Sequence, residues 1–315
     1  MSDAGASSGS AAAVNPVNPA AAFYATPAAR VFSAVLRQAQ RWSPALTARL
    51  ALALFCTPLP GKRHARAKPV PAPWTARHHR FEDGRLATWH RSDVVAGAPK
   101  VLLVHGWAGD AQQWRALGDR LADAGFDPVL LDLPAHGRSD GRRATLPQWV
   151  RALFAVSATQ GPWHGIAAHS LGALAAAHAV ARGLPARRLA LVAVSPPPRQ
   201  FLRWFAGVLG PGEPLAVRMQ AWFERQSGVP MQQFEAAWLG PRLDAPTLLV
   251  HDRDDRTAPL ASAQRLQSAI PGAQLALTQD LGHRRILADP AVHEHLLEHL
   301  LEHLQPGRPG GHERG

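Results

Sequence analysis

A serine, an aspartate and a histidine occur in this order along the chain, each just beyond an apolar segment typical of a strand. They are Ser170, Asp255 and His283. A hydroxyl, a carboxylate and an imidazole are the groups that nucleophilic acyl chemistry requires, because the imidazole removes the hydroxyl proton and the carboxylate orients the imidazole. The residue types therefore indicate a hydrolytic site, provided that the fold brings them together.

The serine lies in the sequence Gly165-Ile-Ala-Ala-His-Ser170-Leu-Gly-Ala. An apolar strand leads into Ser170 and a helix of small residues follows, as a nucleophile elbow requires. Small neighbours avoid clashes in that sharp turn, and here they are Ala168 and Gly172 instead of two glycines. The alternative is a serine that only caps a helix.

The first long apolar strand is predicted at Val101–His105, and a His-Gly-Trp turn ending at Trp107 follows it. The backbone N–H of Trp107, together with that of Leu171, could donate to an oxyanion, since such donors are backbone groups aimed at developing charge. We expect the glycine before Trp107 to let the backbone approach the substrate closely. The alternative is an ordinary loop between a strand and a helix.

Three carboxylates compete for the acid position after the strand at 247–251. They are Asp252, Asp254 and Asp255, and the spacing to Pro259 favours Asp255. We expect its neighbours to cap the loop. The histidine follows Leu281-Gly282, and the glycine predicts a loop that can bring the imidazole over the sheet edge.

The elements that must position these groups alternate regularly. Strands are predicted at Val101–His105, Pro128–Asp132, Gly165–His169, Leu189–Val194, Thr247–His251 and Gln274–Thr278, with a hairpin of His78–Phe81 and Leu86–His90 around Asp83-Gly84. Helical patterns lie at 111–124, 146–160, 171–182 and 261–269. This alternation predicts parallel strands with right-handed crossovers. An aromatic-rich insertion at 198–240 predicts a small helical cap, as core or as a pocket lining.

The first 75 residues differ in character, with eight Lys/Arg against one acidic residue, Asp3. Residues 1–25 predict a disordered leader. Residues 26–75 predict a basic amphipathic helical extension and a proline-rich linker, with helix starts at Thr26-Pro27 and Ser43-Pro44. We favour packing of this extension against the main domain over a weak membrane-surface contact through residues 26–68. Residues 305–315 predict a disordered tail.

Together the His-Gly-Trp turn, the segment Asp132–Asp140, the serine elbow, the Asp-Asp-x-x-x-Pro loop and the Gly-His loop resemble the α/β-hydrolase superfamily in chain order. The resemblance covers residues 76–304. It implies a mostly parallel sheet with helices on both faces. It also implies Ser170 as nucleophile, His283 as general base, Asp255 as its orienting acid, and Trp107 and Leu171 as oxyanion donors.

The function that follows is a serine hydrolase for a carboxylic ester or thioester with an apolar acyl group. Acyl transfer on the same triad and a non-catalytic binding or membrane-associated protein remain alternatives. We expect no cofactor, no metal and no nucleic-acid partner. The single cysteine, Cys56, and the absence of a signal-like segment favour a cytoplasmic location, with peripheral membrane contact as the variant.

Histidines elsewhere are expected to be structural. His105, His136, His169 and His251 lie near strand ends and are interpreted as supporting groups. His295, His299 and His303 match a zinc-protease pattern on a C-terminal helix. The leucine stripe of that segment favours a chance match on a packed helix.

Overall fold

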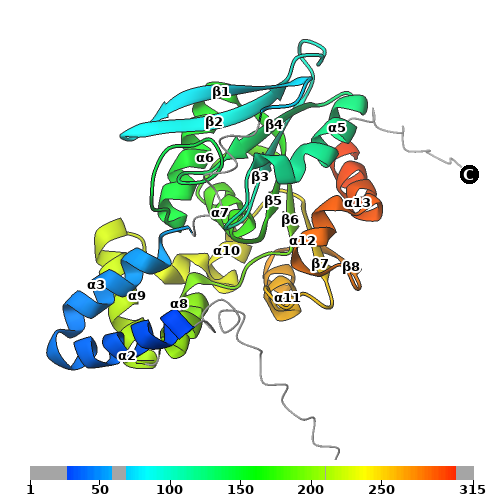
Figure 1. The fold of residues 1–315 in the computed structure, drawn as a ribbon. Coiled ribbons are helices and arrows are strands. Elements are labelled where there is room, and N and C mark those ends of the chain that lie inside the picture. Colours follow the sequence, from blue (N-terminus) through cyan, green and yellow to red (C-terminus); the bar gives the residue numbers. More distant parts are fainter. Residues whose placement is uncertain (1–26, 59–68, 210, 303–315) are drawn as a thin grey trace, which may run out of the picture.

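A computed structural model describes residues 27–58, 69–209 and 211–302. Its core is an eight-stranded sheet with the order β1-β2-β4-β3-β5-β6-β7-β8 (Figure 1). The strands are β1 (Trp74–Phe81), β2 (Gly84–Arg91), β3 (Lys100–Val104), β4 (Asp127–Asp132), β5 (Trp163–His169), β6 (Ala186–Val192), β7 (Thr247–Asp252) and β8 (Gln274–Thr278). The six strands from β3 onward are parallel, whereas β2 is antiparallel to both β1 and β4. The predicted mostly parallel α/β sheet is confirmed.

The hairpin differs from the prediction by one residue. Phe81 pairs with Gly84, so the two turn residues are Glu82 and Asp83, and Glu82 has a φ of 48°. Gly84 is the first residue of β2. A Cβ there would lie 2.9 Å from the Cβ of Asp140, so the glycine is explained by close packing and not by the turn itself.

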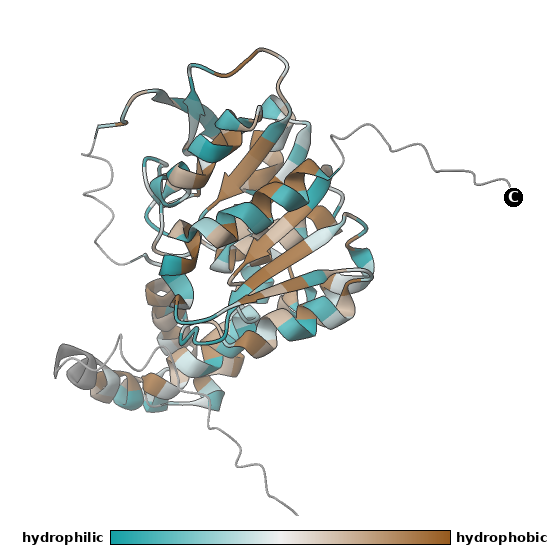
Figure 2. Cartoon of the chain, turned by 90° about the vertical axis from the view of Figure 1, so that its right-hand side faces the viewer, coloured by the Kyte–Doolittle hydropathy of each residue, from teal (hydrophilic) through white to brown (hydrophobic). Residues whose placement is uncertain are grey.

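Two layers of helices cover the sheet. One face carries α6 (Leu146–Gln160), α7 (Ser170–Ala181) and α11 (Leu260–Ala269), and the other carries α5 (Arg115–Asp123) and α13 (Pro290–Leu301). Strand side chains alternate between the faces, so that Leu102 packs under the first layer and Leu103 under the second. Because both faces are covered, the central strands are mostly apolar, as the brown segments in Figure 2 show.

A helical region follows β6 and lies at one end of the sheet. It consists mainly of α8 (Pro198–Val208) and α9 (Glu213–Ser227), followed by the short α10 (Ala236–Leu239). The N-terminal helices α2 (Pro27–Trp42) and α3 (Pro44–Phe55) lie beside α8 and α9 (Figure 1). Leu36 and Leu52 are buried in one cluster with Phe205 and Met219. The extension therefore packs, as expected, but on the helical insertion and not on the sheet.

The expected leader, most of the basic linker and the tail lie outside the described residues. Within the described ranges, no helix is both long and apolar enough to cross a membrane.

Candidate active site

Ser170 lies where β5 ends and α7 begins. Its φ is +55°, in the left-handed region that residues with a side chain seldom adopt. Two glycines make room for this turn. A Cβ on Gly106 would lie 2.8 Å from the Ser170 Cβ, and one on Gly172 would lie 2.1 Å from the carbonyl oxygen of His105. The expected sharp turn is present, and Gly106 permits contact between the chain and the elbow itself.

The three predicted side chains form one hydrogen-bonded chain, although 113 and 28 residues separate the two bonded pairs. The Oγ of Ser170 lies 2.9 Å from Nε2 of His283. Nδ1 of His283 lies 2.7 Å from Oδ2 of Asp255. The structure therefore brings together Ser170, Asp255 and His283 with the imidazole in the middle.

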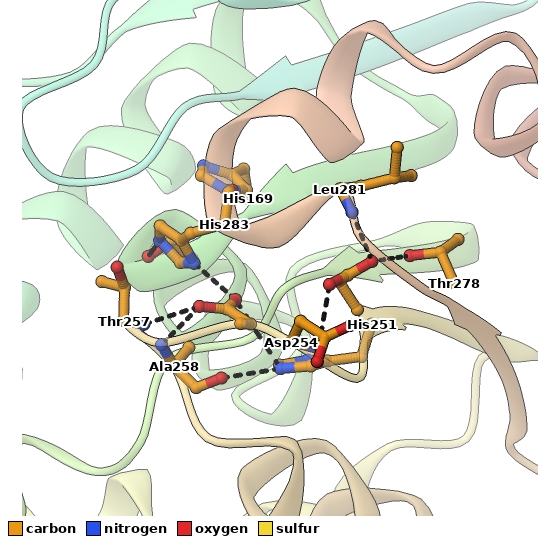
Figure 3. A network of polar contacts seen from close by, with 11 residues as sticks. His169, His251, Asp254, Thr257, Ala258, Thr278, Leu281 and His283 are labelled. Carbon is orange, nitrogen blue, oxygen red and sulfur yellow. Dashed lines mark hydrogen bonds and ion pairs between the residues drawn. The ribbon is translucent and has the colours of Figure 1, made fainter. Parts of the chain in front are cut away.

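The crowded acid loop assigns a separate partner to each carboxylate (Figure 3). The Asp255 side chain has no exposed surface, and its Oδ1 accepts hydrogen bonds from the N–H groups of Thr257 and Ala258, both at 2.8 Å. Those bonds leave Oδ2 to face the imidazole. Asp254 instead accepts from the N–H of Asp280 at 3.1 Å.

Asp252, the last residue of β7, holds the chain that carries His283. Its Oδ2 accepts from the hydroxyl of Thr278 at 2.8 Å and from the N–H of Leu281 at 3.1 Å. Burial acts to raise the pKa of this carboxyl, but the hydrogen bond from Thr278 and those from loop N–H groups outweigh burial, so that the pKa is held below its ordinary value. We expected a loop cap here, and this carboxylate fixes the start of the histidine segment.

His283 lies on the short helix α12 (Gly282–Arg285) and not in an open loop as expected. Gly282 has a φ of +64°, a conformation that favours glycine. The backbone is also tied to the elbow, because Nε2 of His169 donates to the carbonyl oxygen of His283 at 2.8 Å. Burial lowers the pKa of His169 well below its ordinary value, which keeps its ring neutral.

His251 lies next to the carboxylate of Asp255 and to the turn that follows it. Its Nε2 donates to the carbonyl oxygen of Ala258 at 2.8 Å and lies 3.8 Å from Oδ2 of Asp255. Its ring is fully buried. It therefore helps to fix the turn whose N–H groups hold Asp255.

Two neutral histidines flank Trp107 on the other side of Ser170. Nδ1 of His105 donates to the carbonyl oxygen of Gly106 at 2.7 Å, because its Nε2 accepts from the N–H of Leu133 at 3.0 Å. Nε2 of His136 accepts from the N–H of Ala108 at 3.2 Å. The two rings are stacked with centroids 5.2 Å apart. The residues before and after Trp107 are thus both held by imidazoles.

Asp132, the last residue of β4, lies beneath this loop. Its oxygens accept from the N–H of Ala111 at 2.7 Å, the indole N–H of Trp89 at 3.0 Å and the N–H of Arg138 at 3.0 Å. Complete burial raises the pKa of Asp132 to about 6 in spite of these bonds. Gly137 is required beside it, since a Cβ there would lie 2.0 Å from Oδ1 of Asp132.

Sequence reasoning missed the role of Asp132 and the specific partners of the supporting histidines. The usable signal for Asp132 is an aspartate that closes an otherwise apolar strand, the same pattern that Asp252 shows at the end of β7. The second expected donor, Leu171, is the second residue of α7, where N–H groups lack an intrahelical acceptor.

The groups expected to be structural do not meet at a second centre. On α13, His299 is buried and its Nε2 donates to the carbonyl oxygen of Leu189 at 3.1 Å, whereas the side chain of His295 is half exposed. His303 lies outside the described residues. Among the residues that are described, no group of three metal-ligating side chains occurs. Burial raises the pKa of the Cys56 thiol to about 12, so this cysteine stays protonated at neutral pH.

Comparison with known proteins agrees with this architecture. The model of the α/β-hydrolase fold family matches residues 99–226. A pimeloyl-[acyl-carrier protein] methyl ester esterase from Stenotrophomonas maltophilia is 40% identical over 106 residues, which cover 33% of this chain and 39% of that protein. The aligned stretch thus spans about two fifths of the length of this curated relative.

Solved structures extend the fold similarity to most of the chain. A putative lipase from Acinetobacter baumannii has a TM-score of 0.56 at 19% identity, covering 86% of this chain and 95% of its own. The thioesterase domain from the curacin biosynthetic pathway has a TM-score of 0.54 at 16% identity, covering 71% of this chain and 99% of its own. The chain has the fold of the α/β-hydrolase superfamily.

Proposed function

We propose that this chain is a serine hydrolase that cleaves a carboxylic ester or thioester through an acyl-enzyme. The observation that carries the proposal is the continuous hydrogen-bonded path from the Ser170 hydroxyl through His283 to Asp255, with distances of 2.9 and 2.7 Å. The esterase named among its relatives and the thioesterase domain among its structural neighbours support the same class of substrate.

In the acylation step, His283 removes the Ser170 proton at Nε2 while the hydroxyl oxygen attacks the substrate carbonyl carbon. Asp255 accepts the Nδ1 proton in a hydrogen bond and stabilises the imidazolium that forms. His283 then returns the proton to the departing alcohol or thiol. The acyl group remains on Ser170 Oγ as an ester.

The oxyanion of the tetrahedral intermediate is proposed to accept from the backbone N–H groups of Trp107 and Leu171. Each such donor contributes on the order of 3 kcal/mol to the transition state. The two hydrogen bonds around Trp107, from His105 to Gly106 and from Ala108 to His136, support a fixed loop at this position. Water activated by His283 then attacks the acyl carbon and regenerates the serine.

An apolar acyl preference is proposed from a cavity of about 580 Å³ that reaches Leu174, one turn along α7 from Ser170. Val194, Trp204 and Phe234 contribute to its lining, and charged side chains such as Arg203 also line it. The adjoining Ser195 donates its N–H to the carbonyl oxygen of Ser170 at 3.3 Å. Other insertion aromatics serve packing, because Phe205 and Phe223 are buried against the N-terminal helices.

Hydrolysis of p-nitrophenyl esters and acyl thioesters of increasing chain length tests the proposal. Wild type should turn over at least one series, and Ser170→Ala and His283→Ala should each lower kcat roughly 10⁴-fold or more. Ser33→Ala is a matched control, since Ser33 and Ser170 are both 7% exposed and Ser33 lies on α2, outside the lining of the proposed acyl cavity. Equal turnover by wild type and Ser170→Ala, or no turnover by the folded wild type, would reject the proposal.

A further inference from the structure

The large apolar side chains that remain exposed are concentrated on the N-terminal helices. Of the seven in the described residues, four lie on α2 and α3, a small part of the chain. They are Val35, Trp42, Leu46 and Leu50, with exposed fractions of 51–82%. Scattered single residues of this kind need no explanation, but a concentration on one element indicates an interaction surface.

The exposed residues lie on helices that are already packed against the rest of the protein. Their other face is already buried, with Leu36, Ala48 and Leu52 in the cluster that α8 and α9 complete. An amphipathic helix with its apolar stripe buried normally presents a polar face to water. Here the uncovered face of α2 and α3 carries large apolar side chains between its polar ones, and the described chain does not cover them.

The charges that accompany the exposed face are all positive. Residues 27–58 contain four arginines and no acidic residue. Arg37, Arg41 and Arg49 are exposed, and none of them takes part in an ion pair with another described residue. The guanidinium of Arg49 lies 5.7 Å from the ring centroid of Trp222 on α9.

A groove continues this surface between α3 and α9. Its volume is about 460 Å³, and Leu46 and Leu50 form one side of it. Arg49 and Arg143 also line it. Apolar walls beside arginine side chains fit a ligand with a hydrocarbon part and an anionic head.

We propose that the exposed face of α2 and α3 docks on an anionic phospholipid bilayer. Val35, Trp42, Leu46 and Leu50 would enter the boundary between headgroups and acyl chains, where tryptophan side chains are favourable. Arg37, Arg41 and Arg49 bind lipid phosphates, which supplies the charge complementarity that the described chain lacks. Because the same helices pack on α8 and α9, docking places this helical insertion beside the lipid surface. The proposal does not depend on the role of Ser170.

Co-sedimentation of the full chain with vesicles tests this docking. Phosphatidylcholine vesicles with phosphatidylglycerol should bind the protein at least roughly tenfold more tightly than pure phosphatidylcholine vesicles, and high salt should remove the difference. Replacing Arg37, Arg41 and Arg49 together by Gln should weaken binding roughly 100-fold. Trp42→Ala should weaken it roughly tenfold, with far-UV circular dichroism unchanged.

A matched triple variant replaces Arg80, Arg115 and Arg187, three other exposed arginines, by Gln. It lowers the net charge by the same amount. Its vesicle binding should stay within about threefold of wild type, which allows for the smaller net charge. Equal losses in both triple variants would show binding by overall charge and overturn the proposal. Binding that survives the α2–α3 variants would assign it to residues outside this surface, and failure of wild type to bind would also overturn it. A dimer in analytical ultracentrifugation that Trp42→Ala dissociates would identify a second copy as the occupant instead.

Discussion

Asp132 and Asp252 occupy equivalent places on the two sides of Ser170, yet their electrostatic states differ. Each is the fully buried last residue of a parallel strand, and each accepts hydrogen bonds from a loop that carries a proposed functional group. Burial raises the pKa of Asp132 to about 6, whereas hydrogen bonds from Thr278 and loop N–H groups hold that of Asp252 below its ordinary value.

The two carboxyls have no exposed surface, but they differ in how deeply the protein encloses them: Asp132 is surrounded on all sides, whereas Asp252 lies close to the protein surface. Both residues accept at least three hydrogen bonds, so the number of bonds is not decisive. Deeper burial disfavours the charged form of Asp132, and the nearby Asp110 disfavours it further. The charged form of Asp132 is therefore destabilised in the folded protein, whereas the charged form of Asp252 is stabilised.

The largest expected effect is on folding. Asp132→Ala should lower the free energy of unfolding by roughly 3–6 kcal/mol, because it leaves two backbone N–H groups and an indole N–H buried without an acceptor. Urea denaturation measures the change. Asp244→Ala, at an exposed position, serves as control and should stay within about 0.5 kcal/mol of wild type. A loss under about 1 kcal/mol for Asp132→Ala would contradict the structural role.

The pH dependence of stability should differ in sign between the two carboxyls. The folded pKa of Asp132 lies above its value of 3.8 in the unfolded chain, so its contribution is present below that pH and is lost as pH rises to about 6. The loss amounts to roughly 3 kcal/mol. The folded pKa of Asp252 is lowered, so its contribution is present above the unfolded pKa and is lost as pH falls through the folded one.

Thermal unfolding of wild type, Asp132→Asn and Asp252→Asn across this range checks both signs. Buried histidines with pKa values of about 4, such as His90 and His178, titrate in the same interval. Only the difference between wild type and each variant therefore isolates the carboxyl. Parallel curves for wild type and Asp132→Asn would refute the raised pKa.

Asp252→Ala should affect turnover through the position of His283. Loss of the bonds to Thr278 and Leu281 releases the segment before α12, and kcat should fall roughly 10–100-fold with KM little changed. Asp254→Ala is the control, since Asp254 accepts one exposed bond from Asp280, and it should change kcat less than about threefold. Equal kcat for the two variants would remove the distinction between the neighbouring carboxylates.

The smallest expected effect is on turnover, when glycines with a positive φ near to and far from His283 are each replaced by alanine. Gly282 and Gly183 have φ values of +64° and +91°, and a Cβ on either would meet nothing within 4 Å. Alanine at either position should therefore cost about 1–2 kcal/mol of stability. Only Gly282→Ala should also lower kcat, by a few-fold, because it precedes His283. A similar kcat loss in Gly183→Ala would contradict this local explanation.

Local sequence patterns predict the elements of this fold better than the contacts between them. The strand at Gln274–Thr278 and the helix beginning near Leu146 were predicted closely, because apolar periodicity and turn residues are local signals. The approach of Ser170, Asp255 and His283 could be expected from chain order and spacing. The bonds from Asp132 to Trp89 and from His169 to His283 span 43 and 114 residues. Such contacts depend on strand order and packing, which a local pattern does not contain.

The N-terminal helices show the same limit. Their starts were predicted from Thr26-Pro27 and Ser43-Pro44, yet the partner surface on α8 and α9 depends on tertiary packing. The hairpin turn was misplaced by one residue because Gly84 is needed for contact with Asp140, 56 positions away in sequence. A glycine required by packing and one required by a turn look alike in the sequence.

The most direct test of the proposed nucleophile is covalent labelling with a fluorophosphonate probe, followed by peptide mass spectrometry to locate the modified residue. We expect one labelled peptide, with the phosphonate on Ser170, and no labelling of Ser170→Ala. We also expect unchanged labelling of Ser33→Ala, whose serine is as buried as Ser170 but lies on α2. Labelling of Ser170→Ala at the wild-type rate, or no labelling of the folded wild type, would contradict an activated serine at this position.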